Sequence, residues 1–286
     1  MLRRIAFLLA LAVACSSAMA DSPTLERIAE TGEFRIGYVP DAPPLSFKDF
    51  EGDAIGYSVD LCKHIAATVK DHLGLEKLET SFVPLVSMED RISAVEKGDV
   101  DIECGATTVT LSRRERVDFT LMTFITGSAI LSRISRPINT LDDAGGKTIA
   151  AIRGTTTEAV VRRFAEINEI PIKLALIDTH DEGMELLNAG RVDGYASDRA
   201  MLIGQVFRAD NAKEEYAMSR GALSFEPYAM MIRRGDSEFR LVADRALAEL
   251  FRGIRIRRLH QIWFGQLGEP MTPVVEAMYQ FQAVGE

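Results

Sequence analysis

The 286-residue chain contains few cysteines and histidines, and each shortage excludes a class of protein. Its three cysteines and four histidines lack the spacing of a zinc site. After the N-terminal region, no apolar run reaches the roughly 20 residues that a membrane-spanning helix needs. The Gly-x-Ser-x-Gly, phosphate-loop and dinucleotide-binding patterns are all missing. We therefore expect no zinc centre, no cofactor and none of the enzyme classes that those patterns mark.

Basic residues are also fewer than acidic residues. The chain carries 33 Lys and Arg against 42 Asp and Glu, a formal net charge of -9. An acidic chain argues against nucleic acid and anionic membrane surfaces as partners. The net charge does not identify a small ligand, because a pocket can be locally positive.

The N-terminus has the layout of a secretory signal. A positively charged start precedes ten apolar residues, 5–14, and small residues follow at Ala18 and Ala20. A membrane anchor is the alternative, but the apolar run is too short to span a bilayer. Cys15 offers a second alternative, lipid attachment. We expect export to the periplasm, with cleavage near Ala20 and a free protein beyond it.

Two cysteines remain in the exported chain, Cys62 and Cys104. In an oxidising compartment an isolated pair usually bonds. Cys62 falls on the apolar face of a helix expected over 57–73, and Cys104 ends a strand expected over 100–104. The pair is thus predicted to form a disulfide, with two buried free thiols as the alternative.

Strand and helix patterns alternate along the chain, which indicates a largely parallel α/β sheet. The first set consists of strands 34–39, 79–85 and 100–104 and helices 23–31, 57–73 and 87–97. The second set, from about residue 127, consists of strands 148–153, 172–177 and 192–197, and helices that end near 169, 190 and 209. An extended run at 228–232 then leads back, and a helical region at 236–264 is expected to pack against the first set.

Two strand ends have similar sequences. Strand 100–104 leads into Gly105-Ala106-Thr107-Thr108, and strand 148–153 leads into Gly154-Thr155-Thr156-Thr157. Ligands of open α/β sheets bind at the C-terminal edges of strands. Two such edges that face each other would form a cleft.

Several polar residues near these edges have both a structural and a functional interpretation. Thr155 and Glu158 form a capping-box pattern, yet the same helix start suits an anion. Asp198 is placed to cap a helix or to bind an ammonium group. Arg113 suits a carboxylate, although its charged neighbours favour a solvated turn. His180 has the sequence position of a capping or surface residue.

Four stretches together resemble the extracytoplasmic solute-binding proteins of polar amino-acid ABC transporters, family 3, and most of all the glutamate/aspartate type. These stretches are 56–62, 101–108, 154–158 and 180–198. The resemblance extends from residue 25 to about 265. It implies a type II periplasmic binding protein fold, with two Rossmann-like lobes and two hinge crossovers. The implied limits are 1–20 for the signal peptide, 21–126 with 231–286 for lobe one, and 127–230 for lobe two.

The resemblance also implies a role for each candidate residue. Arg113 would clamp the α-carboxylate of an amino acid, assisted by Thr108, Thr155 and Thr156. Asp198, with the Ala106 carbonyl and the Thr108 hydroxyl, would receive the α-ammonium. Arg91 and His180 would face the ligand side chain. A membrane permease with an ATPase is the implied partner, and we expect a monomer.

The chain departs from the acidic-ligand pattern at three positions and from the pattern of other polar amino-acid binders at a fourth. Val39 stands where an arginine is usual, Met88 and Ala106 replace serines, and Ala42 replaces the stacking aromatic of other binders. Glutamate, aspartate, glutamine, asparagine and a modified acidic amino acid therefore all remain candidates.

Two other functional classes remain open. An enzyme of the cyclohexadienyl dehydratase type can share this fold and would need a reactive carboxyl group, for which Glu103 and Glu158 are the nearest candidates. A receptor sensor domain is disfavoured because no second membrane segment is present.

Overall fold

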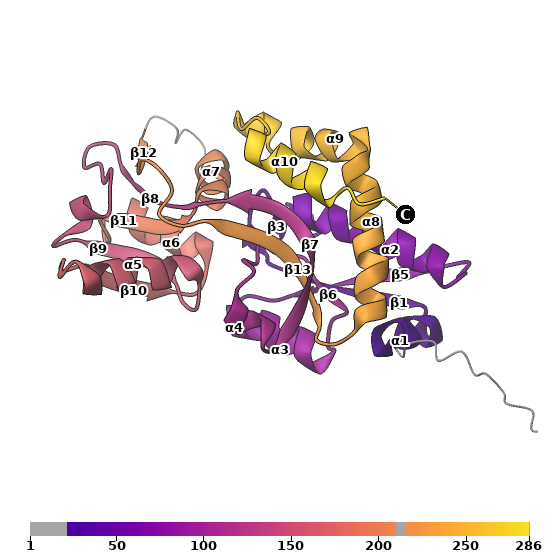
Figure 1. Cartoon of the computed structure of the whole chain (residues 1–286). Helices are drawn as coiled ribbons and strands as arrows, with labels where there is room; N and C mark the ends of the chain where they lie inside the picture. The colour runs from indigo at the N-terminus through magenta and orange to yellow at the C-terminus, as the bar shows by residue number, and fades with distance from the viewer. Residues whose placement is uncertain (1–21, 210–214, 286) are drawn as a thin grey trace, which may run out of the picture.

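The computed structural model describes residues 22–209 and 215–285. The signal predicted for 1–20, with the alternative lipid site at Cys15, lies outside the described residues. Figure 1 shows two α/β lobes joined by long strands that run side by side between them. No helix in the described part of the chain is both long and apolar enough to cross a bilayer.

The first lobe is built on a five-stranded sheet with the order β5-β1-β6-β13-β7. Its strands are β1 (Glu33–Tyr38), β5 (Glu79–Pro84), β6 (Ile102–Glu103), β7 (Val117–Thr126) and β13 (Glu226–Arg233). A small sheet adds β2 (Asp41–Ala42), β3 (Ser46–Lys48) and β4 (Ala54–Ile55). The helices are α1 (Pro23–Thr31), α2 (Tyr57–His72), α3 (Met88–Lys97), α4 (Leu111–Arg114), α8 (Ser237–Arg252), α9 (Ile254–Trp263), η3 (Gly265–Leu267) and α10 (Pro273–Gln282).

The second lobe has a five-stranded sheet with the order β10-β9-β11-β8-β12. Its strands are β8 (Ser128–Arg133), β9 (Thr148–Ile152), β10 (Lys173–Ile177), β11 (Gly194–Asp198) and β12 (Tyr216–Met218). Its helices are η1 (Asp142–Ala144), α5 (Thr156–Ile167), α6 (His180–Asn188) and α7 (Arg199–Arg208). Strand–helix alternation therefore predicted the order of the central elements correctly.

Both sheets are mixed rather than largely parallel. The strands connected by helices are parallel: β1 with β5 and β6, and β9 with β10 and β11. Strand β13 is antiparallel to β6 and β7, and β8 is antiparallel to β11 and β12. Strands β7 and β13 carry the chain between the lobes, β8 follows β7, and β12 precedes β13. They need no helical crossover, so the alternation pattern missed β7, β8 and β12, whereas β13 was expected as the extended run 228–232.

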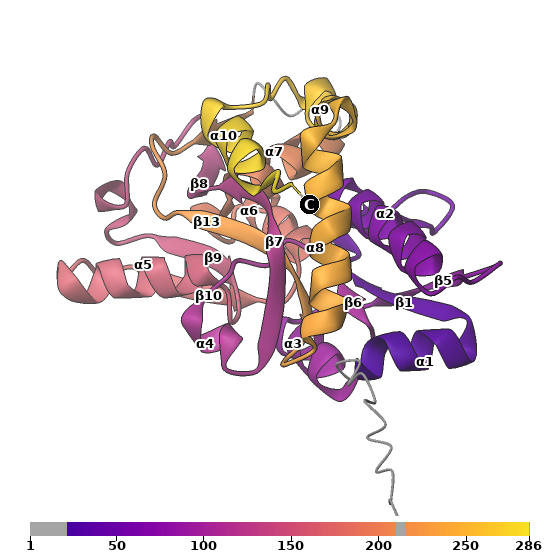
Figure 2. The same cartoon turned by 45° about the vertical axis from the view of Figure 1, so that its right-hand side comes forward.

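The returning C-terminal segment packs on the first lobe, as its periodicity predicted. Helices α8 and α10 lie against β7 (Figure 2). Six apolar residues at helical spacing in α8 are all buried: Phe239, Val242, Ala243, Ala246, Leu247 and Leu250. The expected helical region 236–264 is interrupted, however, because extended backbone at Gly253 ends α8 and begins α9.

The predicted disulfide is confirmed. Cys62 on α2 bonds to Cys104 just after β6, with a Cα–Cα distance of 6.3 Å, and both residues are fully buried. The bond attaches α2 to the edge of the sheet from which the loop 105–108 emerges. It therefore braces one of the two strand ends predicted to form the cleft.

The two crossing segments pack tightly against each other. A Cβ atom at Gly127, between β7 and β8, would lie 2.5 Å from the Ala222 Cβ and 2.7 Å from the Ser224 carbonyl oxygen. Only glycine allows this approach. Strand β13 starts at Glu226 and pairs with β7 from that residue onward. The lobe limits near 126 and 230 stay a prediction.

Candidate functional site

The eight residues predicted for the ligand all line one cavity of about 50 Å³ between the lobes. They are Ala106, Thr108, Arg113, Arg91, Thr155, Thr156, His180 and Asp198. The first four come from the first lobe and the others from the second. Val39, Met88 and Ala42, at which the chain also departs from related binders, line the same cavity.

Arg113 is buried, so the solvated turn favoured by its charged neighbours is the wrong interpretation for this residue. It lies on the short helix α4, capped by Thr110, while Arg114 beside it is exposed. Its Nη1 donates to the Thr108 carbonyl oxygen at 2.7 Å, and its Nη2 donates to the Gly154 carbonyl oxygen at 3.4 Å. Within the described chain, no carboxylate oxygen lies within 4.0 Å of its charged nitrogens. Burial, followed by the charge of Arg91, lowers the Arg113 pKa to about 10, so the group stays cationic at neutral pH.

The N-terminus of α5 reaches the cavity through Thr155, Thr156 and Thr157. Thr155 caps the helix by accepting from the Glu158 N–H at 3.2 Å, as predicted. Glu158, however, accepts from the Gly154 N–H at 2.8 Å and not from Thr155, so the capping box is only half formed. The first N–H groups of a helix lack partners within the helix and favour an anion.

Asp198 is the N-cap residue of α7 by position, but its side chain makes no capping bond. Its Oδ1 accepts from the Thr157 hydroxyl at 2.9 Å, and its Oδ2 accepts from the Tyr228 hydroxyl. Burial, together with the nearby charge of Glu226, raises the Asp198 pKa to about 6. The structure therefore turns this carboxylate toward the cavity rather than toward its own helix.

Glu226 is a buried carboxylate that the sequence did not single out. It is 1% exposed at the start of β13, behind the cavity wall. Its Oε2 accepts from the Thr108 hydroxyl at 2.6 Å and from the Thr156 hydroxyl at 2.7 Å. The extended run 228–232 located the strand but carried no signal for this contact, because the three residues are far apart in the chain.

Arg91 reaches the cavity already paired. Its Nε lies 2.8 Å from Glu103 Oε1, both side chains are buried, and its Nη2 donates to the Thr107 hydroxyl. A Cβ atom at Gly105 would lie 2.3 Å from Glu103 Oε1, 2.7 Å from Arg91 Nη2 and 2.8 Å from a Val39 methyl. Glycine at this position leaves room for the ion pair. Much of the Arg91 charge is thus balanced by Glu103.

His180 lies at the start of α6, and its side chain is buried. Its Nδ1 lies 2.6 Å from the Tyr195 hydroxyl. Burial lowers the pKa of His180 below its usual 6.5, so the ring is neutral at pH 7 when no ligand is bound. The surface role that sequence position suggested for His180 is therefore wrong.

Neither carboxyl group considered for an enzyme lines the cavity. Glu103 is ion-paired with Arg91 and also accepts from Thr107 at 2.8 Å. Glu158 is ion-paired with Arg162 at 2.7 Å. Both groups have structural partners, and neither is placed to exchange a proton with a ligand.

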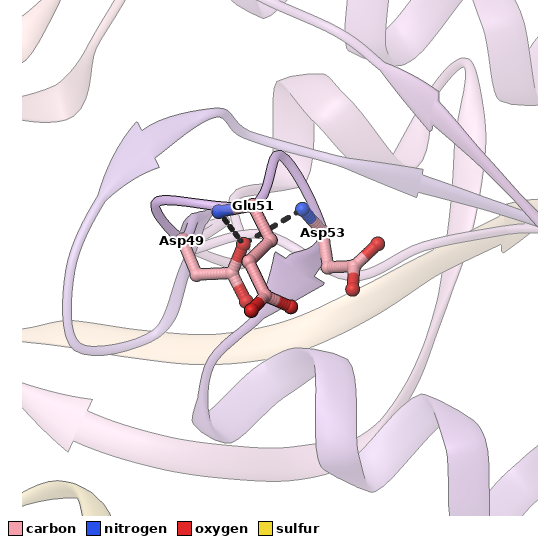
Figure 3. Close-up of side chains that lie close together, drawn as sticks. All are labelled: Asp49, Glu51 and Asp53. Atoms are coloured by element: carbon pink, nitrogen blue, oxygen red, sulfur yellow. Dashed lines mark hydrogen bonds between the residues drawn. The ribbon is translucent and has the colours of Figure 1, made fainter.

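Three carboxylates outside the cavity lie close together in the loop between β3 and β4. Figure 3 shows Asp49, Glu51 and Asp53 in this loop. Asp49 Oδ1 accepts from the Glu51 N–H at 2.9 Å and from the Asp53 N–H at 2.8 Å, which closes the turn. Glu51 and Asp53 are exposed, and the turn accounts for the arrangement without a metal ion.

Residues 34–266 match the family model of bacterial extracellular solute-binding proteins, family 3. The L-glutamate/L-aspartate-binding protein of Pseudomonas aeruginosa is 32% identical over 251 residues, which cover 87% of this chain and 82% of that protein. The glutamate/aspartate import solute-binding protein of Salmonella typhimurium is 28% identical over 254 residues, covering 89% of this chain and 83% of that protein.

Solved structures agree with this assignment. An ancestral arginine-binding protein bound to glutamine has a TM-score of 0.73 at 30% identity, covering 82% of this chain and 98% of that one. An ancestral amino-acid-binding protein, a precursor of cyclohexadienyl dehydratase, has a TM-score of 0.73 at 25% identity, covering 84% and 99%. The two-lobed fold is therefore that of the type II periplasmic binding proteins. The chain belongs to the bacterial extracellular solute-binding proteins of family 3.

Proposed function

We propose that this protein binds a polar L-amino acid, acidic or amide, between its lobes and delivers it to an ABC transporter of the inner membrane. One observation carries the proposal. The Arg113 guanidinium and the Asp198 carboxylate are both buried at the same cavity, and neither forms an ion pair within the described chain. The α-carboxylate and α-ammonium of an amino acid would supply the two missing charges.

The side-chain end of the cavity supports a ligand with a distal carboxylate or amide. Arg91 and His180 line it and offer hydrogen-bond donors. Glu103 balances the charge of Arg91, and His180 is neutral in the absence of ligand. The low net positive charge suits an amide as well as a carboxylate. Relatives that bind glutamate and aspartate agree with this class of ligand.

The remaining parts of the proposal concern location and assembly. We place the exported chain in the periplasm, with its start near Asp21, as a free monomer without a cofactor or nucleic-acid partner. The lobes would close on the ligand by bending at the two crossovers, and the ligand would shift the population toward the closed form. A dehydratase has less support, because Glu103 and Glu158 are both held away from the cavity.

Thermal unfolding with each of the twenty L-amino acids would test the proposal. A ligand at 100 times its dissociation constant stabilises the folded state by about 2.7 kcal/mol. We expect acidic or amide amino acids to raise the melting temperature, and the Arg113→Ala variant to lose the response. Binding of lysine, arginine or large apolar amino acids alone would refute the side-chain class, and no response to any amino acid would refute the function.

A further inference from the structure

Glu226 joins the two lobes without touching the cavity. It does not line the cavity, whereas Thr108 and Thr156 do. Thr108 follows β6 of the first lobe, and Thr156 begins α5 of the second. Both hydroxyls donate to the same carboxylate oxygen, Oε2, at 2.6 and 2.7 Å. The other oxygen, Oε1, accepts from the Ser224 hydroxyl.

The direction of these bonds decides what the two threonines can offer a ligand. A hydroxyl has one proton to donate and two lone pairs that accept, and an ionised carboxylate only accepts. The protons of Thr108 and Thr156 therefore point away from the cavity toward Glu226. Only their lone pairs remain for a ligand. Such an oxygen can accept from an ammonium group but cannot donate to a carboxylate.

The neighbouring hydroxyl groups also donate their protons to acceptors within the protein. Thr157 and Tyr228 donate to Asp198, and Thr155 donates to the Ile152 carbonyl oxygen at 2.7 Å. The resemblance implies two roles for the Thr108 hydroxyl, and these directions favour acceptance from the α-ammonium over donation to the α-carboxylate. They also oppose donation to the α-carboxylate by the hydroxyls of Thr155 and Thr156. Beside these hydroxyls, the Arg113 guanidinium and the N–H groups at the start of α5 are free to donate to the α-carboxylate.

We propose that Glu226 is a positioning residue: by taking the protons of Thr108 and Thr156, it makes both hydroxyls acceptors for the α-ammonium group of the ligand. The inference rests on the proposed amino-acid binding and adds a recognition role for a residue outside the cavity. Because one hydroxyl comes from each lobe, the acceptor pair is complete only when the lobes are closed. Ammonium recognition is thereby linked to closure.

The test measures the preference for an α-ammonium over an α-hydroxyl group. The probes are L-glutamate with (S)-2-hydroxyglutarate, and L-glutamine with its 2-hydroxy analogue, measured by calorimetry. Replacing Glu226 by methionine removes the acceptor at similar size and frees both hydroxyl protons. We expect the ratio of the two affinities to fall by at least about tenfold, which is the scale of a hydrogen bond to a charged group.

The conservative variant Glu226→Gln separates hydrogen-bond direction from charge. A glutamine can turn its carbonyl oxygen toward the two threonines while its amide group donates to Ser224, so we expect the ammonium preference to be largely restored. Glu276→Gln makes the same change at a partly exposed carboxylate paired with Arg257 and is the matched control. A loss of preference in Glu226→Gln equal to that in Glu226→Met would overturn the proposal in favour of a simple charge effect.

Two further outcomes are decisive. If the affinity of Glu226→Met falls by the same factor for both probes, the substitution has disturbed the site in general. That result also overturns the proposal. If that variant does not fold, the Thr108→Val and Thr156→Val pair removes the acceptors directly. We then expect the affinity for the amino acid to fall while the affinity for the hydroxy acid stays the same. An equal fall in both affinities would refute the role. Wild-type protein that binds no amino acid would instead refute the proposed function.

Discussion

Asp41 of the first lobe caps a helix of the second lobe. Its Oδ2 accepts from the His180 N–H at 2.6 Å and from the Asp181 N–H at 3.3 Å, in the first turn of α6. Its carbonyl oxygen accepts from Gln205 Nε2 at 2.7 Å. A carboxylate is favoured at this position because the N-terminal end of a helix carries partial positive charge. The contact forms only while the lobes are together.

Replacing Asp41 by alanine should therefore weaken ligand binding by weakening closure. A lost helix cap costs about 0.5–2 kcal/mol, which corresponds to a roughly twofold to thirtyfold loss of affinity. Asp41→Asn keeps an acceptor oxygen and should lose less. Calorimetry measures the affinity, and small-angle scattering with ligand measures the closed fraction. Unchanged closure in Asp41→Ala would show that the cap contributes nothing to it.

Arg113 should be the residue whose loss costs the most affinity. Truncating one partner of a buried charge pair costs about 2 to 5 kcal/mol, and a micromolar ligand is bound by only about 8 kcal/mol. Arg113→Ala should thus be hard to saturate with ligand. The affinity of Arg113→Lys should lie between those of the wild type and Arg113→Ala, because an ammonium group cannot form two parallel hydrogen bonds with a carboxylate. Arg114→Ala, on the exposed side of α4, is the control. Near-normal affinity in Arg113→Ala would place the carboxylate elsewhere.

Affinity for L-glutamine should fall as the pH drops below about 6. The pKa of Asp198 is about 6 in the ligand-free protein, and an ammonium ligand favours the ionised form. Binding below this pH must therefore expel a proton, which weakens the affinity by up to about tenfold per pH unit. Calorimetry from pH 5 to pH 8 measures the profile. Asp198→Asn should bind weakly and without this dependence, and a flat wild-type profile would contradict the assignment of Asp198.

The same series with L-glutamate reports on His180. Its lowered pKa leaves the ring neutral at pH 7, and a distal carboxylate would favour the protonated ring. Protonation of His180 strengthens glutamate binding at acid pH and opposes the effect of Asp198. We therefore expect the glutamate profile to decline less on acidification than the glutamine profile. Identical profiles would show that His180 does not face the distal group.

The disulfide should stabilise the fold without affecting the ligand. Cys62 and Cys104 are 42 residues apart, and closing a loop of this size is worth about 3 to 4.7 kcal/mol in the chain-entropy model. The double variant Cys62→Ala with Cys104→Ala should lose stability of this order in denaturant unfolding. Its affinity should persist, because neither residue lines the cavity. Two alkylatable thiols in the exported wild-type protein would contradict the bond.

Introducing an arginine at Val39 should favour glutamate over glutamine. Val39 is buried at the cavity, close to Arg91 and Glu103. A desolvated guanidinium is satisfied by a carboxylate and poorly by an amide. Val39→Met supplies similar bulk without charge and is the control. Competition between the two amino acids measures the preference, and an equal shift in both variants would attribute it to size alone.

Local sequence patterns predicted the elements that repeat a simple period or a strand–helix alternation. The apolar face of α2 placed Cys62 in the core. The glycine and threonine turns after β6 and β9 located the two edges of the cavity. The crossing strands β7 and β13 were less visible, because strands that link two sheets need neither a crossover helix nor a tight turn. The helix break at Gly253 was also not predicted, because a single residue there interrupts an otherwise continuous apolar periodicity.

The sequence by itself determined the α/β class, the acidic character, the cysteine pair and the set of polar residues at the strand ends, and it predicted export. Only the tertiary structure decided how those residues are used. Arg113 is buried and forms no ion pair with the residues that the structure describes, Glu103 balances the charge of Arg91, and the hydroxyl protons of Thr108 and Thr156 are donated to Glu226. Charge, burial and hydrogen-bond direction at a site depend on groups that are distant along the chain. They become defined only when folding brings the two lobes and the crossing strands together.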